Sequence, residues 1–396
     1  MLDIDNKNKG SAREVFLTFP VLGLTSFGGP VAHLGYFRRA LVQQRAWVNE
    51  SQYTQLLALC QFLPGPASSQ LGFALGLLRA GWMGAIAAFV GFTLPSALLL
   101  VGAAAALPYL SSAQGELAVH GLKLLACAVV ADAVLGMSKN LLSDTKTRAL
   151  ALIACGLLLV LDGALYQLLV VGGAAIVGIL IGNTGQVQPL TLAPGYSARL
   201  GLFWLGVFFA CFVALLLGTQ FGGLWVLAEA FYRAGALVFG GGHVVLPLLE
   251  ASVVGQGWVS EDAFLAGYGA SQAIPGPMFA FAAYLGALSE TGVGALWGAS
   301  VALISLFLPG FLLVSAALPL WQKINAYASA RRAVMGVNAA VVGVLASALY
   351  DPVFTSAVND GVDLAIVLLA FGILRIWQLS PLWAVLACVF ASFLFV

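Results

Sequence analysis

The tripeptide Pro-Gly-Pro occurs twice in the sequence, at residues 64–66 and 275–277, each time inside an apolar stretch. Proline lacks a backbone N–H and breaks a helix, and glycine permits turns that other residues avoid. A helix that meets the tripeptide must end, and a new one can begin directly after it. The free N–H groups and the dipole at the start of that new helix favour an anion. The paired breaks therefore predict an anion-binding site.

Further donors lie close to these breaks. Ser68 and Ser69 follow the first tripeptide and would add hydroxyl donors, whereas Met278 and Phe279 follow the second. Two glycine-rich segments, at residues 27–30 and 239–242, would expose more backbone N–H at close approach. We expect a small oxyanion held mainly by N–H and hydroxyl groups. The alternative is that these glycines and prolines serve only tight helix packing in a membrane.

Other polar residues each allow a functional and a structural interpretation. His33 and His243 would donate to the oxyanion or carry a coupling proton, or else pack at an interface. Gln61 and Gln272 precede the tripeptides at equal spacing, which favours hydrogen bonds at the breaks. The charged candidates for coupling or anion attraction are Lys123 and Asp132 within one predicted span, and Glu229 and Arg233 at a spacing that allows a helical ion pair.

Composition gives the class of protein. Of the 396 residues 61% are hydrophobic and only 8% are charged, where a soluble domain has about a quarter charged. The five cysteines are scattered without metal or redox spacing, and no catalytic motif appears. We therefore expect an all-α polytopic membrane protein that is not an enzyme, with no cofactor, no metal and no nucleic-acid partner.

The sequence repeats itself once. Phe27 is followed 212 residues later by Phe239, Trp47 is followed 211 residues later by Trp258, and Pro64 is followed 211 residues later by Pro275. This nearly constant spacing predicts two homologous halves, at residues 13–182 and 224–396. A linker at 183–223 carries one additional span, at 200–217.

Loop charges orient the two halves. After the first glycine-rich segment the first half carries Arg38, Arg39 and Arg45, where the second half carries Glu250, Glu261 and Asp262. Because Lys and Arg favour cytoplasmic loops, opposite signs at matching loops predict an inverted repeat, with a cytoplasmic N-terminus in an inner membrane.

The apolar run before the first tripeptide is too short to cross a bilayer. Residues 51–63 as a helix reach only about 20 Å, against a hydrocarbon core of about 30 Å. We therefore expect re-entrant hairpins at the tripeptides, and more weakly at the glycine-rich segments, where residues 14–37 would alternatively span. The expected full spans are 82–107, 117–137, 149–161, 164–182, 200–217, 293–318, 333–349, 364–374 and 381–396.

Several stretches resemble the chromate ion transporter family in its long, two-half form. They include FGGPVAHLGYFRRALVQQRAWV, QFLPGPASSQLGFALG and GWVSEDAFLAGYGASQAIPGPMFAF, and the similarity covers nearly the whole chain. The resemblance implies export of chromate from the cytoplasm, with chromate resistance and with sulfate as analogue and competitor. The motif positions that it implies are Phe27, Gly28, Gly29, Pro30, His33, Trp47, Gln61, Pro64, Gly65, Pro66, Phe239, Gly240, Gly241, Gly242, Trp258, Gln272, Pro275, Gly276 and Pro277. The expected binding site consists of these motif residues except Pro30, Trp47 and Trp258. Ala67, Ser68, Ser69 and His243 complete it.

Two functions from different classes remain open at this point. The first is a secondary transporter of a divalent oxyanion, with alternating access between the halves. The second is a passive anion channel with re-entrant pore helices. Saturable flux that depends on a coupling ion distinguishes the two, and a homodimer is compatible with either.

Overall fold

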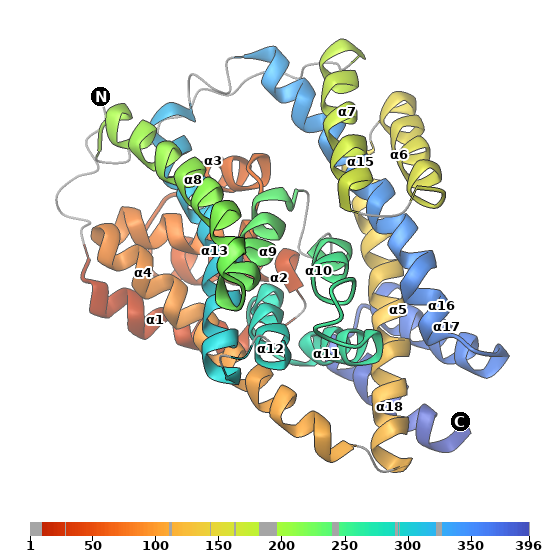
Figure 1. The fold of residues 1–396 in the computed structure, drawn as a ribbon. Coiled ribbons are helices and arrows are strands. Elements are labelled where there is room, and N and C mark those ends of the chain that lie inside the picture. Colours follow the sequence, from red (N-terminus) through yellow and green to blue (C-terminus); the bar gives the residue numbers. More distant parts are fainter. Residues whose placement is uncertain are drawn as a thin grey trace.

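The computed structural model describes residues 10–27, 29–110, 113–142, 144–161, 164–181, 196–239, 245–289, 292, 294–321 and 327–395. Within these residues the fold consists of helices and their connections (Figure 1). This agrees with the all-α fold expected from composition.

The first half runs from a helix near the N-terminus to the linker. Its elements are α1 (Ala12–Thr25), α2 (Gly29–Phe37), the π-helical turn η2 (Arg38–Gln44), α3 (Glu50–Phe62), α4 (Ala67–Ala106), η3 (Leu107–Leu110), α5 (Ala113–Leu141), α6 (Thr145–Leu158) and α7 (Ala164–Ile181). The linker contributes α8 (Ala198–Gly218) and η4 (Thr219–Phe221).

The second half repeats this order. Its elements are α9 (Leu224–Leu237), α10 (Val245–Val253), α11 (Glu261–Ala273), η6 (Met278–Ala280), α12 (Phe281–Leu288), α13 (Ala295–Ala317), η7 (Leu318–Leu320), α15 (Ala328–Ala348), η8 (Leu349–Phe354), α16 (Thr355–Ala357), α17 (Gly361–Arg375) and α18 (Pro381–Phe395).

The helices on either side of the first tripeptide are short, as expected. α3 begins at a capping box in which the side chains of Asn49 and Gln52 each accept the other's backbone N–H, and it ends after 13 residues. α4 begins directly after Pro66 and is broken at Ala80 and Gly81, where φ and ψ leave the helical range. Its first part therefore forms the second limb of a hairpin, and its second part forms a long separate helix.

The same close approach of helices recurs in both halves. Gly23 of α1 lies against the Phe92 carbonyl of α4, and Gly235 of α9 lies against the Leu306 carbonyl of α13, so closely that neither site has room for a Cβ. Small residues let helix backbones approach in membranes. The repeat seen in the sequence is thus also a repeat in packing.

The halves exchange their central helices. α5 of the first half packs against α11, α17 and α18 of the second, whereas α15 of the second half packs against α6 and α7 of the first. Figure 1 shows both exchanges at the right of the molecule. The two halves are therefore interlocked, which the sequence does not reveal.

Five described helical stretches are long and apolar enough to cross a membrane. They are Ala67–Tyr109, Gln114–Leu141, Ala198–Phe221, Ala295–Leu320 and Ala328–Ala357. Shorter apolar helices lie at Tyr166–Ile181, Met278–Leu288 and Pro381–Phe395. Only 6% of the apolar window of α8 is buried, which suits a linker helix that faces lipid.

Candidate functional site

Each Pro-Gly-Pro tip is hydrogen-bonded to the residue directly before the glycine-rich segment of the other half. We call residues 64–66 the first tip and residues 275–277 the second tip. The backbone N–H of Gly65 donates to the Val238 carbonyl at 2.6 Å, and the N–H of Gly276 donates to the Ser26 carbonyl at 3.0 Å. The two bonds are equivalent under the repeat, so the tips cross between the halves.

The tips also contact the proline-containing helices of the opposite half. Gln70 Nε2 donates to the Pro64 carbonyl of its own tip at 2.8 Å and to the Gly310 carbonyl of α13 at 3.1 Å. Ser96 Oγ, from α4, donates to the Pro275 carbonyl at 2.6 Å. Gly310 and Ser96 each directly follow a helix proline. Each tip is therefore held by one backbone bond and by one polar side chain, Gln70 Nε2 at the first tip and Ser96 Oγ at the second.

Both tip glycines have backbone conformations that L residues rarely adopt. The φ angle is +121° at Gly65 and +95° at Gly276. A Cβ on Gly65 would lie 3.0 Å from Gly310 Cα, and a Cβ on Gly276 would overlap Ser96 Oγ. Glycine is therefore needed at both tips for conformation and for space.

The helix starts after the two tips differ. Pro66 supplies no side-chain cap to α4, and Ala67, Ser68 and Ser69 form its first turn, with both serines buried. After Pro277 the chain instead forms a short 3₁₀ turn at η6, with Met278 and Phe279 buried. Hydroxyl groups thus lie beside the first tip and apolar side chains beside the second, as the sequence predicts.

The glutamines are placed differently from the expectation. Gln61 is exposed, and Gln272 Nε2 bonds within its own helix region, to the Ser271 hydroxyl at 3.2 Å. Gln70, which was not among the predicted site residues, is the amide that bonds the first tip. The sequence gives only a weak signal that Gln70 belongs to the site, because a glutamine one turn into an apolar helix can serve many structural roles.

The other predicted site residues are only partly described. His33 is fully buried on α2, with its ring edge against Phe92 at a centroid distance of 5.4 Å. Phe27 is half-buried, and the half-buried Phe239 packs near Val337 and Val341 of α15. Gly29 belongs to the first turn of α2. The remaining predicted residues lie outside the described residues, namely Gly28, Gly240, Gly241, Gly242 and His243.

Three polar side chains of α5 pair with the other half. Lys123 Nζ lies 2.7 Å from Asp262 Oδ1, and Arg375 lies 3.4 Å from Asp132. His120 Nε2, which was not among the predicted site residues, lies 2.7 Å from the buried Asp363 Oδ1. Three polar contacts along its length therefore hold α5 against the second half.

Replacing Asp363 by alanine is expected to destabilise the protein by about 3 kcal/mol, because it removes a buried carboxylate that accepts from His120 and from the Asn359 N–H. Asp363→Asn retains an acceptor and should cost clearly less. Thermal unfolding in detergent measures both variants. Equal melting temperatures for wild type and Asp363→Ala would show that this contact does not hold α5.

Glu229 and Arg233 form the helical ion pair predicted from their spacing, with Arg233 Nε 2.8 Å from Glu229 Oε1. Arg233 also lines a cleft between α7, α9 and α10. Gln167 and Ser252 contribute polar atoms to that cleft. Neither Glu229 nor Arg233 takes part in the hydrogen bonds that the structure describes at the tips.

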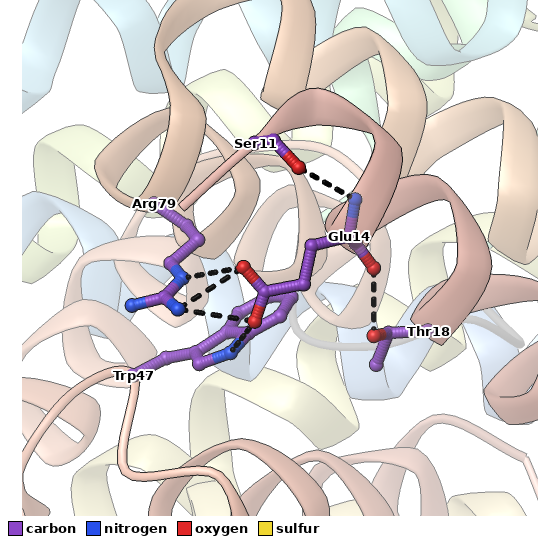
Figure 2. Close-up of polar contacts among 5 residues, drawn as sticks. All are labelled: Ser11, Glu14, Thr18, Trp47 and Arg79. Carbon is purple, nitrogen blue, oxygen red and sulfur yellow. Dashed lines mark hydrogen bonds and ion pairs between the residues drawn. The ribbon is translucent and has the colours of Figure 1, made fainter. Parts of the chain in front are cut away.

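A polar cluster closes the base of the first hairpin (Figure 2). Glu14 accepts from Arg79 Nη2 at 3.0 Å and from Trp47 Nε1 at 3.1 Å, and the Arg79 guanidinium lies 5.3 Å from the centre of the Trp47 ring. The Gly10 N–H donates to the Arg79 carbonyl. The chain therefore leaves this point at α1, returns to it at Trp47, and returns again at Arg79, as two successive hairpins do.

The comparisons with known proteins agree with the sequence repeat. The family described as Chromate transporter matches the chain twice, at residues 13–179 and 225–393. The chain is 27% identical over 344 residues to the chromate transport protein of Pseudomonas aeruginosa, covering 85% of this chain and 80% of that protein. It is 28% identical to a probable chromate transport protein of Synechococcus elongatus (86% and 84% covered).

A third relative, the chromate transport protein of Cupriavidus metallidurans, is 27% identical over 375 residues, which are 90% of this chain and 86% of that protein. No solved structure matches the chain. The double match and the length of these similarities show that the chain belongs to the chromate transporter family, as a multi-pass membrane protein of two repeated halves.

Proposed function

We propose that this protein exports chromate across the cytoplasmic membrane as a secondary transporter and thereby confers chromate resistance. The relatives named above support chromate as the substrate. The observation that carries the mechanism is the crossed bonding of each tip to the other half, at Gly65–Val238 and Gly276–Ser26. We call this contact between the two halves, at the crossed tips, the seam. Such a contact allows one half to move against the other around a central anion.

Irregular backbone supports a site at the tips. Backbone that is not helical persists at membrane depth only where it faces protein or a water-filled cavity. The two tips supply such backbone, one from each half. With hydroxyl and N–H donors nearby and no clustered Lys or Arg in the tip sequences, the site suits an oxyanion that must also be released.

The transport experiment uses inside-out vesicles from cells that express the full chain. We expect uptake of labelled chromate that saturates, is competed by sulfate, and depends on an imposed pH gradient or voltage. The two gradients are applied separately to identify the driving force. A flux that rises linearly with the chromate concentration and does not depend on either imposed gradient would instead identify a passive channel.

The inverted repeat predicts that matching loops lie on opposite sides of the membrane. Arg45 follows α2 and η2 in the first half, and Gln256 follows α10 in the second, and both are exposed. Single cysteines at 45 and 256, in a background without the five native cysteines, should label from opposite sides with an impermeant thiol reagent. Labelling from the same side would contradict the inversion.

A further inference from the structure

Basic side chains gather where α6 begins, α7 ends and α15 begins. The Lys146 ammonium donates to the Ile181 carbonyl, at the last residue of α7, at 3.0 Å. Three residues earlier on α7, Gly178 lies so close to the Arg332 carbonyl of α15 that no Cβ would fit between them. We call four residues at this place the basic corner, namely Lys146, Arg148, Arg331 and Arg332.

The cations of the corner are bonded to backbone rather than to carboxylates. Lys146, Arg148 and Arg332 each donate to a main-chain carbonyl. None of the three forms an ion pair with a residue that the structure describes. By contrast, Lys123 and Arg79 each have a carboxylate partner. The positive charge of these three side chains therefore has no counter-charge within the described chain.

The sequence around the corner supplies little negative charge. Asp144 lies two residues before Lys146, but its carboxylate caps the start of α6 by accepting from the Thr147 N–H and hydroxyl. Residues 182–195 and 322–326, which follow α7 and precede α15, add one lysine and no acidic residue. The counter-anion of the corner therefore comes from outside the chain.

The corner lies at one surface of the bilayer. The helical stretch from Arg331 to Asp351 is about 30 Å long at 1.5 Å per residue, which matches the thickness of the hydrocarbon core. Charged side chains therefore stand at both ends of a membrane-spanning length. Beside the corner, Leu180 and Ile176 of α7 are 74% and 63% exposed, as side chains that face acyl chains are. The corner thus lies where lipid headgroups meet acyl chains.

We propose that the basic corner binds the headgroup of an anionic phospholipid. The headgroup phosphate accepts hydrogen bonds from the guanidinium and ammonium groups, and the acyl chains lie along the exposed apolar face of α7. Because Lys and Arg favour the cytoplasmic side, this lipid belongs to the cytoplasmic leaflet. The inference does not depend on which substrate the protein transports.

A lipid at this place joins the two halves of the protein. Lys146 and Arg148 belong to the first half, and Arg331 and Arg332 belong to the second. α6 and α7 lie against α15 at the upper right of Figure 1, as part of the exchange between the halves. A headgroup held from both sides therefore stabilises this exchanged packing.

The first test measures lipid binding by the purified full chain. Native mass spectrometry in detergent reports the affinity for phosphatidylglycerol, with phosphatidylcholine of the same acyl chains as the neutral reference. Lys146→Gln combined with Arg148→Gln should weaken the tightest phosphatidylglycerol binding by about thirtyfold, because each cation beside an anionic headgroup contributes about fivefold. Binding of phosphatidylcholine should not change. Both side chains are exposed, so we expect this double variant to fold.

The matched control removes the same charge from another place. Arg38→Gln combined with Arg39→Gln also deletes two exposed cations, where Glu50 already pairs with Arg38. This control variant should keep the wild-type affinity for phosphatidylglycerol. Equal losses of affinity in the two double variants would show that the lipid responds only to net charge, and would overturn the proposal.

The second test separates a lipid from a free anion. Phosphatidylglycerol well above its dissociation constant should raise the melting temperature of the wild-type protein in detergent by about 2 °C or more, because it binds the folded state. The variant with Lys146→Gln and Arg148→Gln should lose most of this rise. Phosphatidylcholine should give a smaller rise, and inorganic phosphate should give none. A rise with inorganic phosphate or with phosphatidylcholine that equals the rise with phosphatidylglycerol would overturn the proposal.

Discussion

Replacing Gly276 by alanine is expected to abolish chromate transport while the protein still inserts in the membrane. At φ +95° an L residue is strained by about 1–2 kcal/mol, and the new Cβ would overlap Ser96 Oγ and lie 3.0 Å from the Gly23 carbonyl oxygen. The second tip must then move, and the bonds from Gly276 to Ser26 and from Ser96 to Pro275 are lost together. Vesicle uptake of labelled chromate, normalised to membrane level, measures the effect.

The first tip should behave in the same way, and a third glycine provides the control. Gly65→Ala places a Cβ 3.0 Å from Gly310 Cα at a φ of +121°. At Gly102 of α4 an added Cβ would have no atom within 4 Å and the φ is an ordinary helical one, so Gly102→Ala should preserve transport. Normal rates of chromate transport in Gly276→Ala, Gly65→Ala and Gly102→Ala alike would mean that the geometry of the tips does not affect transport of the anion.

Replacing Arg79 by glutamine is expected to loosen the first hairpin and to lower stability by about 1–3 kcal/mol. The Arg79 and Glu14 side chains are only 16% and 31% exposed, so the loss leaves a partly buried carboxylate with Trp47 as its one remaining described side-chain donor. Thermal unfolding in detergent measures the loss of stability. Transport should fall as well, because the limb that follows the first tip ends at Arg79.

Arg38 offers a matched control on the same half. It pairs with Glu50 at 2.7 Å, but both side chains are 52% exposed. Exposed ion pairs contribute about 0–1 kcal/mol, so Arg38→Gln should be nearly neutral. If Arg38→Gln and Arg79→Gln destabilise equally, the cluster of Figure 2 is an ordinary surface contact rather than the closure of the hairpin.

Much of the fold follows from local sequence signals. Proline and glycine at 64–66 and 275–277 end one helix and start the next, and Asn49 and Ser260 cap the helices that lead to the tips. These effects act over a few residues, so sequence reasoning reaches them. The repeat also shows directly, because the two halves kept their landmarks at constant spacing.

The exchange between halves could not be predicted in this way. Whether α5 packs on its own half or on α17 and α18 of the other half depends on long-range contacts. Because the two halves are similar in sequence, both arrangements fit the sequence equally well. The role of Ser96 was missed for a related reason, since its partner Pro275 lies 179 residues away. A comparison of the halves position by position, which sets Ser96 against Gly310, is the signal that could have identified this contact.

The seam at the second tip can be tested by thiol accessibility during transport. Ser96 is 1% exposed and bonded to the Pro275 carbonyl, so a cysteine there should react slowly with a small impermeant reagent in resting vesicles. Sulfate replaces chromate in this assay because chromate oxidises thiols. In an otherwise cysteine-free variant that retains transport, we predict that Cys substituted for Ser96 reacts faster when a gradient drives sulfate flux, while a cysteine at the exposed Arg45 reacts at one rate throughout. Continued protection of position 96 during measurable flux would contradict a path for the anion at the crossed tips.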